Sequence, residues 1–403
     1  MLLATERGRY LEPTLDWALS RSQLSPRDRA FATHLSYGAM QRRLYLDHVL
    51  APRLKAPEKL PPALRWILRL GSFERLFMRT PDYAAVHAWV ELAKKEAPRL
   101  APLVNAVLRR VEDDPRAPEW VRASLPAFLW HHWQAFFGEA DFAHAFNEPP
   151  PLWVTAFPGA EAALKAEGVP FEPGPIPGSL KLGVPNLRAL AAYKKGLIQP
   201  QNPASLFAAQ LLEARPGERV LDLAGGAGIK AAWLAARGAE VTSYDLNPKR
   251  QRAGRENLRR LGQRVSFKTH DLRQPLAETA PRVLLDALCA GTGTLRHHPE
   301  LRYRLEPEAI RDMAYLQRRL LDTAAATVEP GGRLVYAVCS LTEDEGEAMV
   351  RDFLKKNPAF TLEPIPGPLP WLRKELGAYV RPEQGLDGFY YARFRRAPLP
   401  SPG

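Results

Sequence analysis

The spacing of hydrophobic residues changes along the chain, and each change marks a different kind of predicted structure. Up to about residue 140 the apolar positions recur with helical spacing, for example at Phe31, Leu35 and Met40. Residues 25–28, Ser-Pro-Arg-Asp, are a typical helix start, with a capping serine, a proline at the first helical position and an acid in the first turn. No alternating strand pattern interrupts this part, so we predict an all-helical domain over residues 1–140.

The next part of the chain is rich in proline and glycine. Three consecutive prolines occupy positions 149–151, and further prolines and glycines punctuate residues 170–185. Between them lie only short apolar pieces, which are too short for a large core of their own. We therefore predict a small α+β connector over residues 141–200.

The third part alternates between strand and helix patterns from residue 201 to residue 396. Strands are predicted at residues 219–223, 240–244, 265–268, 282–286 and 333–338, with helices at 229–237, 248–261 and 306–328. This alternation predicts an α/β domain with a parallel sheet covered by helices on both faces. Residues 397–403 form a short tail.

Composition narrows the class of partner. The 403 residues carry a net charge of +12, and the sequence pI is about 9.7. Such an excess favours polyanionic partners, because each cation placed near a phosphate releases a counterion. The sequence shows neither an apolar membrane-spanning segment nor the apolar core of a signal peptide at its start, so we expect a cytoplasmic monomer with no membrane contact.

Acidic residues follow the predicted strands at the edge where open α/β sheets bind their ligands. They are Asp222, Asp245, Asp271 and Asp286. The first strand leads into the cluster Ala224, Gly225, Gly226, Ala227, Gly228, Ile229 and Lys230, which lets the backbone approach a ligand. Asp245 lies where an acid takes ribose hydroxyls. Dinucleotide enzymes and methyltransferases share this pattern, so it does not separate them.

The chain has only two cysteines, and both fall on the same predicted sheet edge. Cys289 follows the strand that ends at Asp286, and Cys339 ends the last predicted strand. Two thiols cannot form a metal cluster, and we predict no metal site. A thiolate that adds to carbon 6 of cytosine makes carbon 5 able to take a methyl group from a sulfonium. Asp286 is placed to stabilise the charge that builds up near N3.

Taken together, these motifs resemble those of the RNA m5C methyltransferases of the RsmB/Sun family over nearly the whole chain. The family's glycine, DxPC, TCS and closing motifs correspond to residues 222–230, 286–289, 338–340 and 387–392, and its NusB-like domain to residues 28–31, 37–38 and 104–110. The resemblance implies a NusB-like RNA-binding domain and a Rossmann-like, mostly parallel seven-stranded methyltransferase domain. It also implies S-adenosyl-L-methionine as cofactor and cytosine 967 of 16S ribosomal RNA as target.

The resemblance also assigns roles to single residues. Cys339 would be the nucleophile, and Cys289 would help to release the methylated RNA. The segment from Ala224 to Lys230 would wrap the methionine end of the cofactor, and Asp286 would border both cofactor and target base. Asp245 would hold the ribose and Asp271 would face the adenine. The basic stretch at residues 296–299, Arg-His-His-Pro, would touch RNA.

The chain departs from the family pattern at Ala227, Ile229, Leu288 and Val338, and none of these changes removes a reacting group. Three alternatives stay open at this point. A nicotinamide-dependent oxidoreductase would leave the cysteine motifs unexplained. A non-catalytic RNA-binding assembly factor need not retain both thiols. The same chemistry on tRNA or on another rRNA site is the third.

Overall fold

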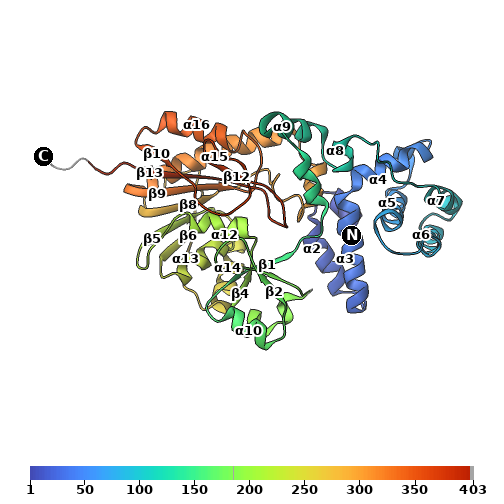
Figure 1. Cartoon of the computed structure of the whole chain (residues 1–403), viewed down its shortest axis with the longest axis horizontal. Helices are drawn as coiled ribbons and strands as arrows, with labels where there is room; N and C mark the ends of the chain where they lie inside the picture. Colours follow the sequence, from blue (N-terminus) through green and yellow to red (C-terminus); the bar gives the residue numbers. More distant parts are fainter. Residues whose placement is uncertain (185, 400–403) are drawn as a thin grey trace. The chain divides into compact units, whose positions relative to one another are not determined.

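The structure is a computed structural model that describes residues 1–184 and 186–399 of the chain (Figure 1). The described residues form two compact units. The first unit comprises residues 1–150 and 294–305, and the second comprises residues 151–293 and 306–399. The end of the predicted tail, residues 400–403, lies outside the described residues. Within those described, no helix is long and apolar enough to cross a membrane.

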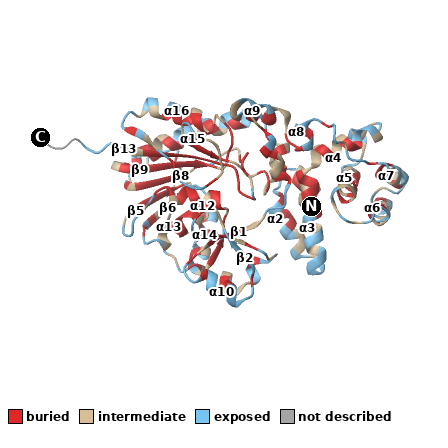
Figure 2. Cartoon of the chain, viewed as in Figure 1, coloured by how far each residue is buried: buried red, intermediate tan, exposed pale blue. Residues whose placement is uncertain are grey.

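The first unit is helical, as its apolar spacing predicts. Its α-helices are α1 (Leu2–Glu6), α2 (Leu11–Ser20), α3 (Pro26–Gln41), α4 (Arg43–Leu50), α5 (Pro62–Phe77), α6 (Asp82–Glu96), α7 (Ala101–Leu108), α8 (Glu119–Arg122) and α9 (Ala127–Phe137). The predicted cap is present, since the hydroxyl of Ser25 accepts a hydrogen bond from the backbone N–H of Asp28 at 3.2 Å. Their apolar faces form the buried cores of this unit, seen as red segments in Figure 2.

A segment from much later in the chain completes the first unit. Residues 294–305 leave the second unit, contribute the 3-10 turn Pro299–Tyr303 to the helical unit, and then return. Arg302 anchors this segment from inside the helical unit, where its side chain is only 1% exposed. Its guanidinium donates to the side-chain oxygen of Asn147 at 2.7 Å and to several backbone carbonyls, among them that of Gln41 at 2.7 Å. Burial lowers the pKa of Arg302 to about 10, so the group is still charged at neutral pH.

We expect Arg302→Ala to destabilise the protein by about 3 kcal/mol or more, because buried carbonyls lose their donor and each costs roughly 1–3 kcal/mol when left unsatisfied. Urea unfolding of the full chain, followed by circular dichroism, measures the change. Arg99→Ala removes an exposed arginine of the same unit and should change stability by less than about 0.5 kcal/mol. Equal effects of the two substitutions would contradict the anchoring role of Arg302.

The second unit begins with a small sheet in the region predicted as an α+β connector. Its strands β1 (Leu152–Ala156), β2 (Phe171–Pro173), β3 (Ser179–Leu182) and β4 (Ile198–Pro200) pair in the antiparallel order β2-β3-β1-β4. Helices α10 (Ala160–Ala166) and α11 (Ala191–Lys194) accompany the sheet, and they share a small apolar core with it. The three predicted domain boundaries stay predictions.

The main sheet of this unit has the alternating architecture that the sequence predicts. Its strands are β5 (Arg219–Leu223), β6 (Glu240–Asp245), β7 (Ser266–Thr269), β8 (Ala280–Asp286), β9 (Val328–Val338), β10 (Phe360–Glu363), β11 (Trp371–Arg373), β12 (Ala378–Val380) and β13 (Phe389–Arg396). The helices are α12 (Pro203–Gln210), α13 (Ile229–Ala236), α14 (Pro248–Arg260), α15 (Pro307–Thr327) and α16 (Glu347–Lys356). Strands β9, β8, β5, β6 and β7 are parallel neighbours in that order.

The predicted fold class is confirmed, with one difference in the sheet. Among the described residues the sheet has nine strands rather than seven, in the order β11-β12-β13-β9-β8-β5-β6-β7 with β10 beside β13. Strands β10 to β13 are antiparallel to their neighbours. Two of them, β11 and β12, span three residues each, which is too short for an alternating pattern to predict them. The connection from β7 to β8, residues 270–279, contains no helix.

Candidate active site

The parallel strands bring the predicted chemical groups to one edge of the sheet, because their carboxyl ends point the same way. Asp222 lies one residue before the end of β5, Asp245 and Asp286 end β6 and β8, and Cys339 follows β9. Strands β8 and β9 are direct neighbours, with Asp286 opposite Ala337 in the ladder. The two cysteine-bearing loops therefore start side by side.

The sulfur atoms of Cys289 and Cys339 lie 3.3 Å apart. Both side chains are partly exposed, so a base brought to this edge can reach them. The loop of Cys289 is pinned to that of Cys339 by a hydrogen bond from the Gly293 N–H to the Cys339 carbonyl, at 3.0 Å. The hydroxyls of Thr292 and Ser340, 2.9 Å apart, form a second link. The cysteine pair is thus held by backbone and side-chain bonds on both sides.

A hydrogen bond to Cys339, together with burial, raises the pKa of Cys289 well above its usual value. Cys289 is therefore a protonated thiol at neutral pH. In that form its S–H is able to donate a hydrogen bond to the sulfur of Cys339. A protonated Cys289 beside Cys339 suits the role of proton donor in the pair.

A buried carboxylate that the sequence did not single out lies beneath both loops. The carboxylate of Glu345 accepts hydrogen bonds from the Ala290 N–H at 2.8 Å and from the hydroxyl of Thr342 at 3.0 Å. It also accepts from the side chains of Gln317 at 2.9 Å and Ser340. Burial raises the pKa of Glu345, and these four donors oppose that rise. Glu345 therefore connects the Cys289 loop to the Cys339 loop.

We expect Glu345→Ala to lower kcat by about 100-fold while leaving cofactor affinity unchanged, because a displacement of about 1 Å at a reacting group costs that much. Single-turnover methyl transfer and a separate cofactor titration measure the two quantities. Glu345→Gln retains one acceptor oxygen and should recover part of the rate. Asp344→Ala, the matched control in the same turn, should behave like the wild type. Wild-type kcat in both Glu345 variants would rule out a positioning role.

The glycine loop after β5 packs tightly against the strand ends. A Cβ built at Gly225 would lie 2.0 Å from Oδ2 of Asp222, so no other residue fits there without a shift. The N–H of Gly226 donates to Oδ2 of Asp245 at 2.9 Å, which ties the loop to β6. Gly226 and Gly228 have φ of +57° and +66°, a region that favours glycine. Ala224 adopts a φ of +57° in the same loop.

A cavity of about 310 Å³ opens beside this loop. It is lined by Pro200, Gln201, Asn202, Ser205, Asp222, Gly225, Ile229, Lys230, Asp286 and Asp387. Oδ1 of Asp222 and Nε2 of Gln201, both buried in this lining, have no hydrogen-bond partner among the described residues. Burial raises the pKa of Asp222 to about 7, against the lowering effects of the Ser243 hydroxyl and the Lys230 ammonium. The cavity therefore offers an acceptor and a donor to a small polar ligand, and a cationic group bound there would favour the Asp222 carboxylate.

Lys230 and Asp286 meet at the cavity wall. The ammonium of Lys230 lies 2.5 Å from Oδ2 of Asp286, and it also lies 5.8 Å from the centre of the Phe389 ring. Lys230 comes from α13 and Asp286 from the end of β8, so the ion pair joins the glycine loop to the segment that carries Cys289. The cofactor-side and base-side groups are thus connected through this pair.

Asp245 and Asp271 are not among the residues that line this cavity. The carboxylate of Asp245 accepts the Gly226 and Asn247 N–H groups. Asp271 lies two residues beyond β7 and is paired with Arg273 at 2.6 Å, which lowers the pKa of Asp271 to about 2. Leu288, at the place of the family's proline, is 51% exposed beside Cys289.

The expectation that residues 296–299 touch RNA is wrong for Arg296. Its side chain is 1% exposed, and its guanidinium lies 3.8 Å from the carboxylate of Glu148 within the helical unit. The carbonyl of Arg296 accepts a hydrogen bond from Gln41 at 3.0 Å. Arg296 and Pro299 are buried in the helical unit because they belong to the segment that Arg302 anchors, whereas His297 and His298 are half-buried.

The mostly parallel sheet, with a glycine loop beside a polar cavity at the carboxyl edge of its strands, has the methyltransferase fold. Residues 209–395 match the family described as 16S rRNA methyltransferase RsmB/F, and residues 1–113 match the NusB family. The chain belongs to the RsmB family of 16S rRNA methyltransferases.

Similar proteins cover almost the whole chain. The ribosomal RNA small subunit methyltransferase B of Thermus thermophilus is 57% identical over 397 residues, covering 98% of this chain and 96% of that protein. The protein of the same name from Vibrio cholerae is 30% identical, covering 93% and 91%. The crystal structure of PH0851 matches with a TM-score of 0.78 and 26% identity, covering 93% of this chain and 92% of that one.

Proposed function

We propose that this chain is a cytoplasmic enzyme that methylates carbon 5 of a cytosine in 16S rRNA, with S-adenosylmethionine as methyl donor and Cys339 as nucleophile. The observation that carries the proposal is the 3.3 Å contact between the two cysteine sulfurs at the sheet edge that also holds the polar cavity. Family membership supports the RNA substrate. The net charge of +12 suits an RNA partner.

In the proposed reaction the thiolate of Cys339 forms a bond to carbon 6 of the cytosine. The electrons of the C5–C6 double bond then make carbon 5 nucleophilic, which unmodified cytosine does not offer. The target base has to leave its stack for the sulfur to reach it, and single-stranded RNA allows this at the lowest cost. The addition places negative charge toward N3. The ammonium of Lys230, which lies 2.5 Å from Asp286, would stabilise that charge directly, and the carboxyl group of Asp286 would do so by donating a proton to N3.

Release requires the reverse of the first bond. After methylation, the proton on carbon 5 goes to a base, the electrons of that C–H bond restore the C5–C6 double bond, and the C6–S bond breaks to return the Cys339 thiolate. Cys289 is placed to assist, because its thiol proton can stabilise the departing sulfur across 3.3 Å. The raised pKa of Cys289 keeps that proton in place at neutral pH.

The cavity residues fit the methionine end of S-adenosylmethionine. The cofactor carries a cationic amino group and a carboxylate, and the cavity offers the unpartnered Oδ1 of Asp222 and Nε2 of Gln201. The cofactor supplies a methyl group on a sulfonium, which the nucleophilic carbon 5 takes. We assign the loop from Ala224 to Lys230 to the methionine end, Asp245 to the ribose and Asp271 to the adenine.

We further propose that residues 1–140 serve as an RNA-binding domain, 141–200 as a connector and 201–396 as the catalytic domain. A direct test of the whole proposal is methylation of unmodified 16S rRNA by the purified chain with S-adenosylmethionine. Bisulfite sequencing should then show one cytosine that resists conversion, at the position equivalent to 967. A resistant cytosine in tRNA instead would mean that the chain methylates another RNA. Absence of any protected cytosine in either RNA would overturn the proposal.

A further inference from the structure

One short stretch of this chain carries a large excess of positive charge, and none of its Lys or Arg residues has a role in the proposed methyl transfer. Residues 248–273 hold nine Lys or Arg residues and two Asp or Glu residues, an excess of seven charges within the chain's net +12. This stretch comprises α14, the turn after it, β7 and the first residues of the helix-free connection to β8. A local excess of this size is typical of a surface that attracts a binding partner of opposite charge.

Three of the arginines of α14 stand on one side of the helix. Arg252, Arg255 and Arg259 are spaced three and four residues apart, which places them on successive turns of one stripe, and all three are exposed. The buried residues of the same helix, Gln251, Gly254 and Leu258, form a separate stripe that packs inward. The stripe of arginines therefore faces solvent along most of α14.

These cations are not engaged in ion pairs. Among the described residues, no carboxylate lies within 4.0 Å of the charged groups of the following side chains: Lys249, Arg250, Arg252, Arg255, Arg259 and Arg264. By contrast, Lys268 and Arg273 in the same stretch are neutralised by Glu278 and Asp271. Like charges three and four residues apart destabilise a helix. The unpaired stripe thus costs helix stability, and no carboxylate within 4.0 Å in the described part of the chain compensates it.

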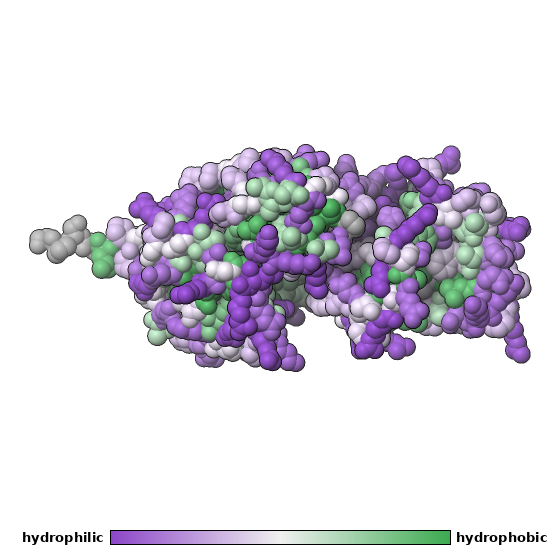
Figure 3. Space-filling model, turned by 90° about the horizontal axis from the view of Figure 1, so that it is seen from below, coloured by the Kyte–Doolittle hydropathy of each residue, from purple (hydrophilic) through white to green (hydrophobic). Residues whose placement is uncertain are grey.

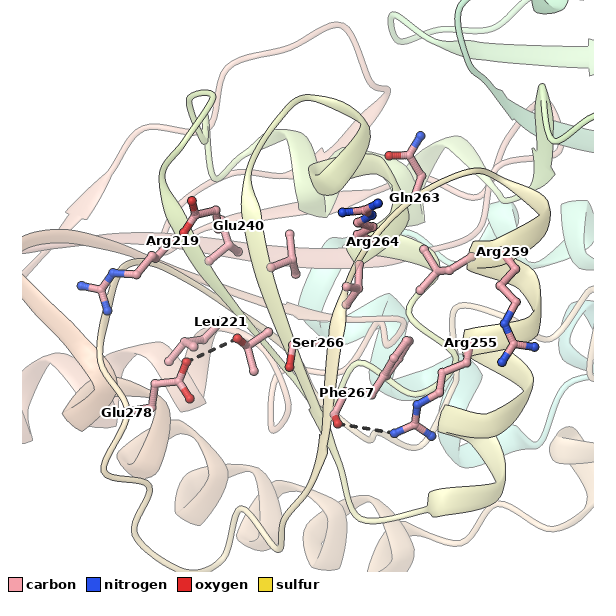
Figure 4. Close-up of a pocket in the computed structure, with 15 residues that line it drawn as sticks. Arg219, Leu221, Glu240, Arg255, Arg259, Gln263, Arg264, Ser266, Phe267 and Glu278 are labelled. Atoms are coloured by element: carbon pink, nitrogen blue, oxygen red, sulfur yellow. Dashed lines mark hydrogen bonds between the residues drawn. The ribbon is translucent and has the colours of Figure 1, made fainter.

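A groove of about 600 Å³ runs beside the stripe, because the connection from β7 to β8 carries no helix to cover this part of the sheet. Figure 4 shows Arg255 and Arg259 on one side of the groove and Glu240 and Glu278 on the other, with Arg264 between them. The guanidinium of Arg255 lies 5.3 Å from the centre of the Phe267 ring and donates to the Phe267 carbonyl at 3.4 Å, which holds it at the rim. Arg255 is therefore held in place on the α14 side of the groove, next to Arg259.

We propose that the basic rim formed by Arg252, Arg255, Arg259 and Arg264 binds the sugar–phosphate backbone of the RNA substrate. Guanidinium groups pair with phosphate oxygens through two parallel hydrogen bonds, and their spacing along a helix matches a linear polyanion. The contact positions the RNA and reads no base. Hydrophilic residues dominate the face of this unit drawn in Figure 3, in keeping with a charged partner. This inference rests on the proposed function, which supplies the RNA.

The test uses the full-length chain with three substitutions, Arg255→Gln, Arg259→Gln and Arg264→Gln. The matched control removes three exposed cations from α16 through Arg351→Gln, Lys355→Gln and Lys356→Gln. Fluorescence anisotropy with a labelled 16S rRNA fragment gives Kd across a range of KCl concentrations. Loss of three phosphate contacts should reduce the slope of log Kd against log salt by about two to three and weaken binding about tenfold or more near 0.1 M salt.

Methyl transfer is measured on the same proteins, and KM for RNA should rise while kcat and cofactor affinity are unchanged. An RNA affinity and salt slope equal to those of the α16 control would overturn the inference. The binding assay needs no turnover. A wild-type chain that binds the fragment through this rim but transfers no methyl group would overturn the proposed function and support the rim. Circular dichroism confirms that each variant is folded.

Discussion

Cys339→Ala is expected to abolish methyl transfer while leaving the cofactor affinity of the protein unchanged. Without the sulfur no bond forms to carbon 6, and carbon 5 of cytosine stays too weak a nucleophile to take the methyl group. Removal of a nucleophile of this kind lowers kcat by roughly 10⁴-fold or more. The cavity that we assign to the cofactor is lined by other residues, so its chemistry is untouched.

Transfer of radiolabelled methyl groups to unmodified 16S rRNA measures the first quantity, and calorimetric titration with S-adenosylmethionine measures the second. Cys339→Ser serves as a matched variant that changes one atom and retains the size of the side chain. It should be as inactive as the alanine variant, since a serine hydroxyl is not ionised at neutral pH. Measurable turnover in Cys339→Ala would refute the assignment of the nucleophile.

Cys289→Ala is expected to stall the reaction after methylation, with protein and RNA joined through Cys339. Cys289 is the thiol that lies 3.3 Å from the departing sulfur, and its raised pKa keeps it protonated at neutral pH. Removing it takes away the hydrogen bond that stabilises the sulfur as the C6–S bond breaks. Multiple turnover should fall by about 10²-fold or more, within the usual range for loss of one acid or base catalyst.

A denaturing gel shows the stalled species as a slowly migrating protein–RNA band that forms only when S-adenosylmethionine is present. The double variant Cys289→Ala with Cys339→Ala is the control, and it should give no such band because the bond to carbon 6 cannot form. A Cys289→Ala protein that turns over at the wild-type rate, with no band at any time, would remove Cys289 from the release step.

Much of the catalytic unit could be predicted because its elements are long and its patterns are strong. Strand β5 is a mostly buried run followed by a glycine loop, and a cysteine follows β9, so the order of chemical groups along the sheet edge followed from the order of the strands. The helix boundaries at Ile229 and Pro248 agree with the glycine and proline signals in the sequence. These boundaries depend on neighbouring residues alone, so a single sequence is enough to predict them.

The residues that sequence reasoning missed have their roles through contacts between distant segments. Glu345 stands in an acidic run, Glu343 to Glu345, that looks solvated, yet its carboxylate is fully buried. Arg296 looked like an RNA contact, but the chain carries it into the helical unit. Burial depends on which segments pack together, and a single sequence does not show this.

The sequence by itself determined the fold class, the two thiols and the acids of the sheet edge. The hydrophobic period and the positions of the strand ends depend on consecutive residues only. Only the tertiary structure decided that the two sulfurs touch, that Glu345 joins their loops and that a groove is left open beside the arginines of α14. Those features come from the pairing of β8 with β9 and from a connection without a helix. Both depend on contacts between segments far apart in the chain, where the free energy of packing rather than local pattern selects the arrangement.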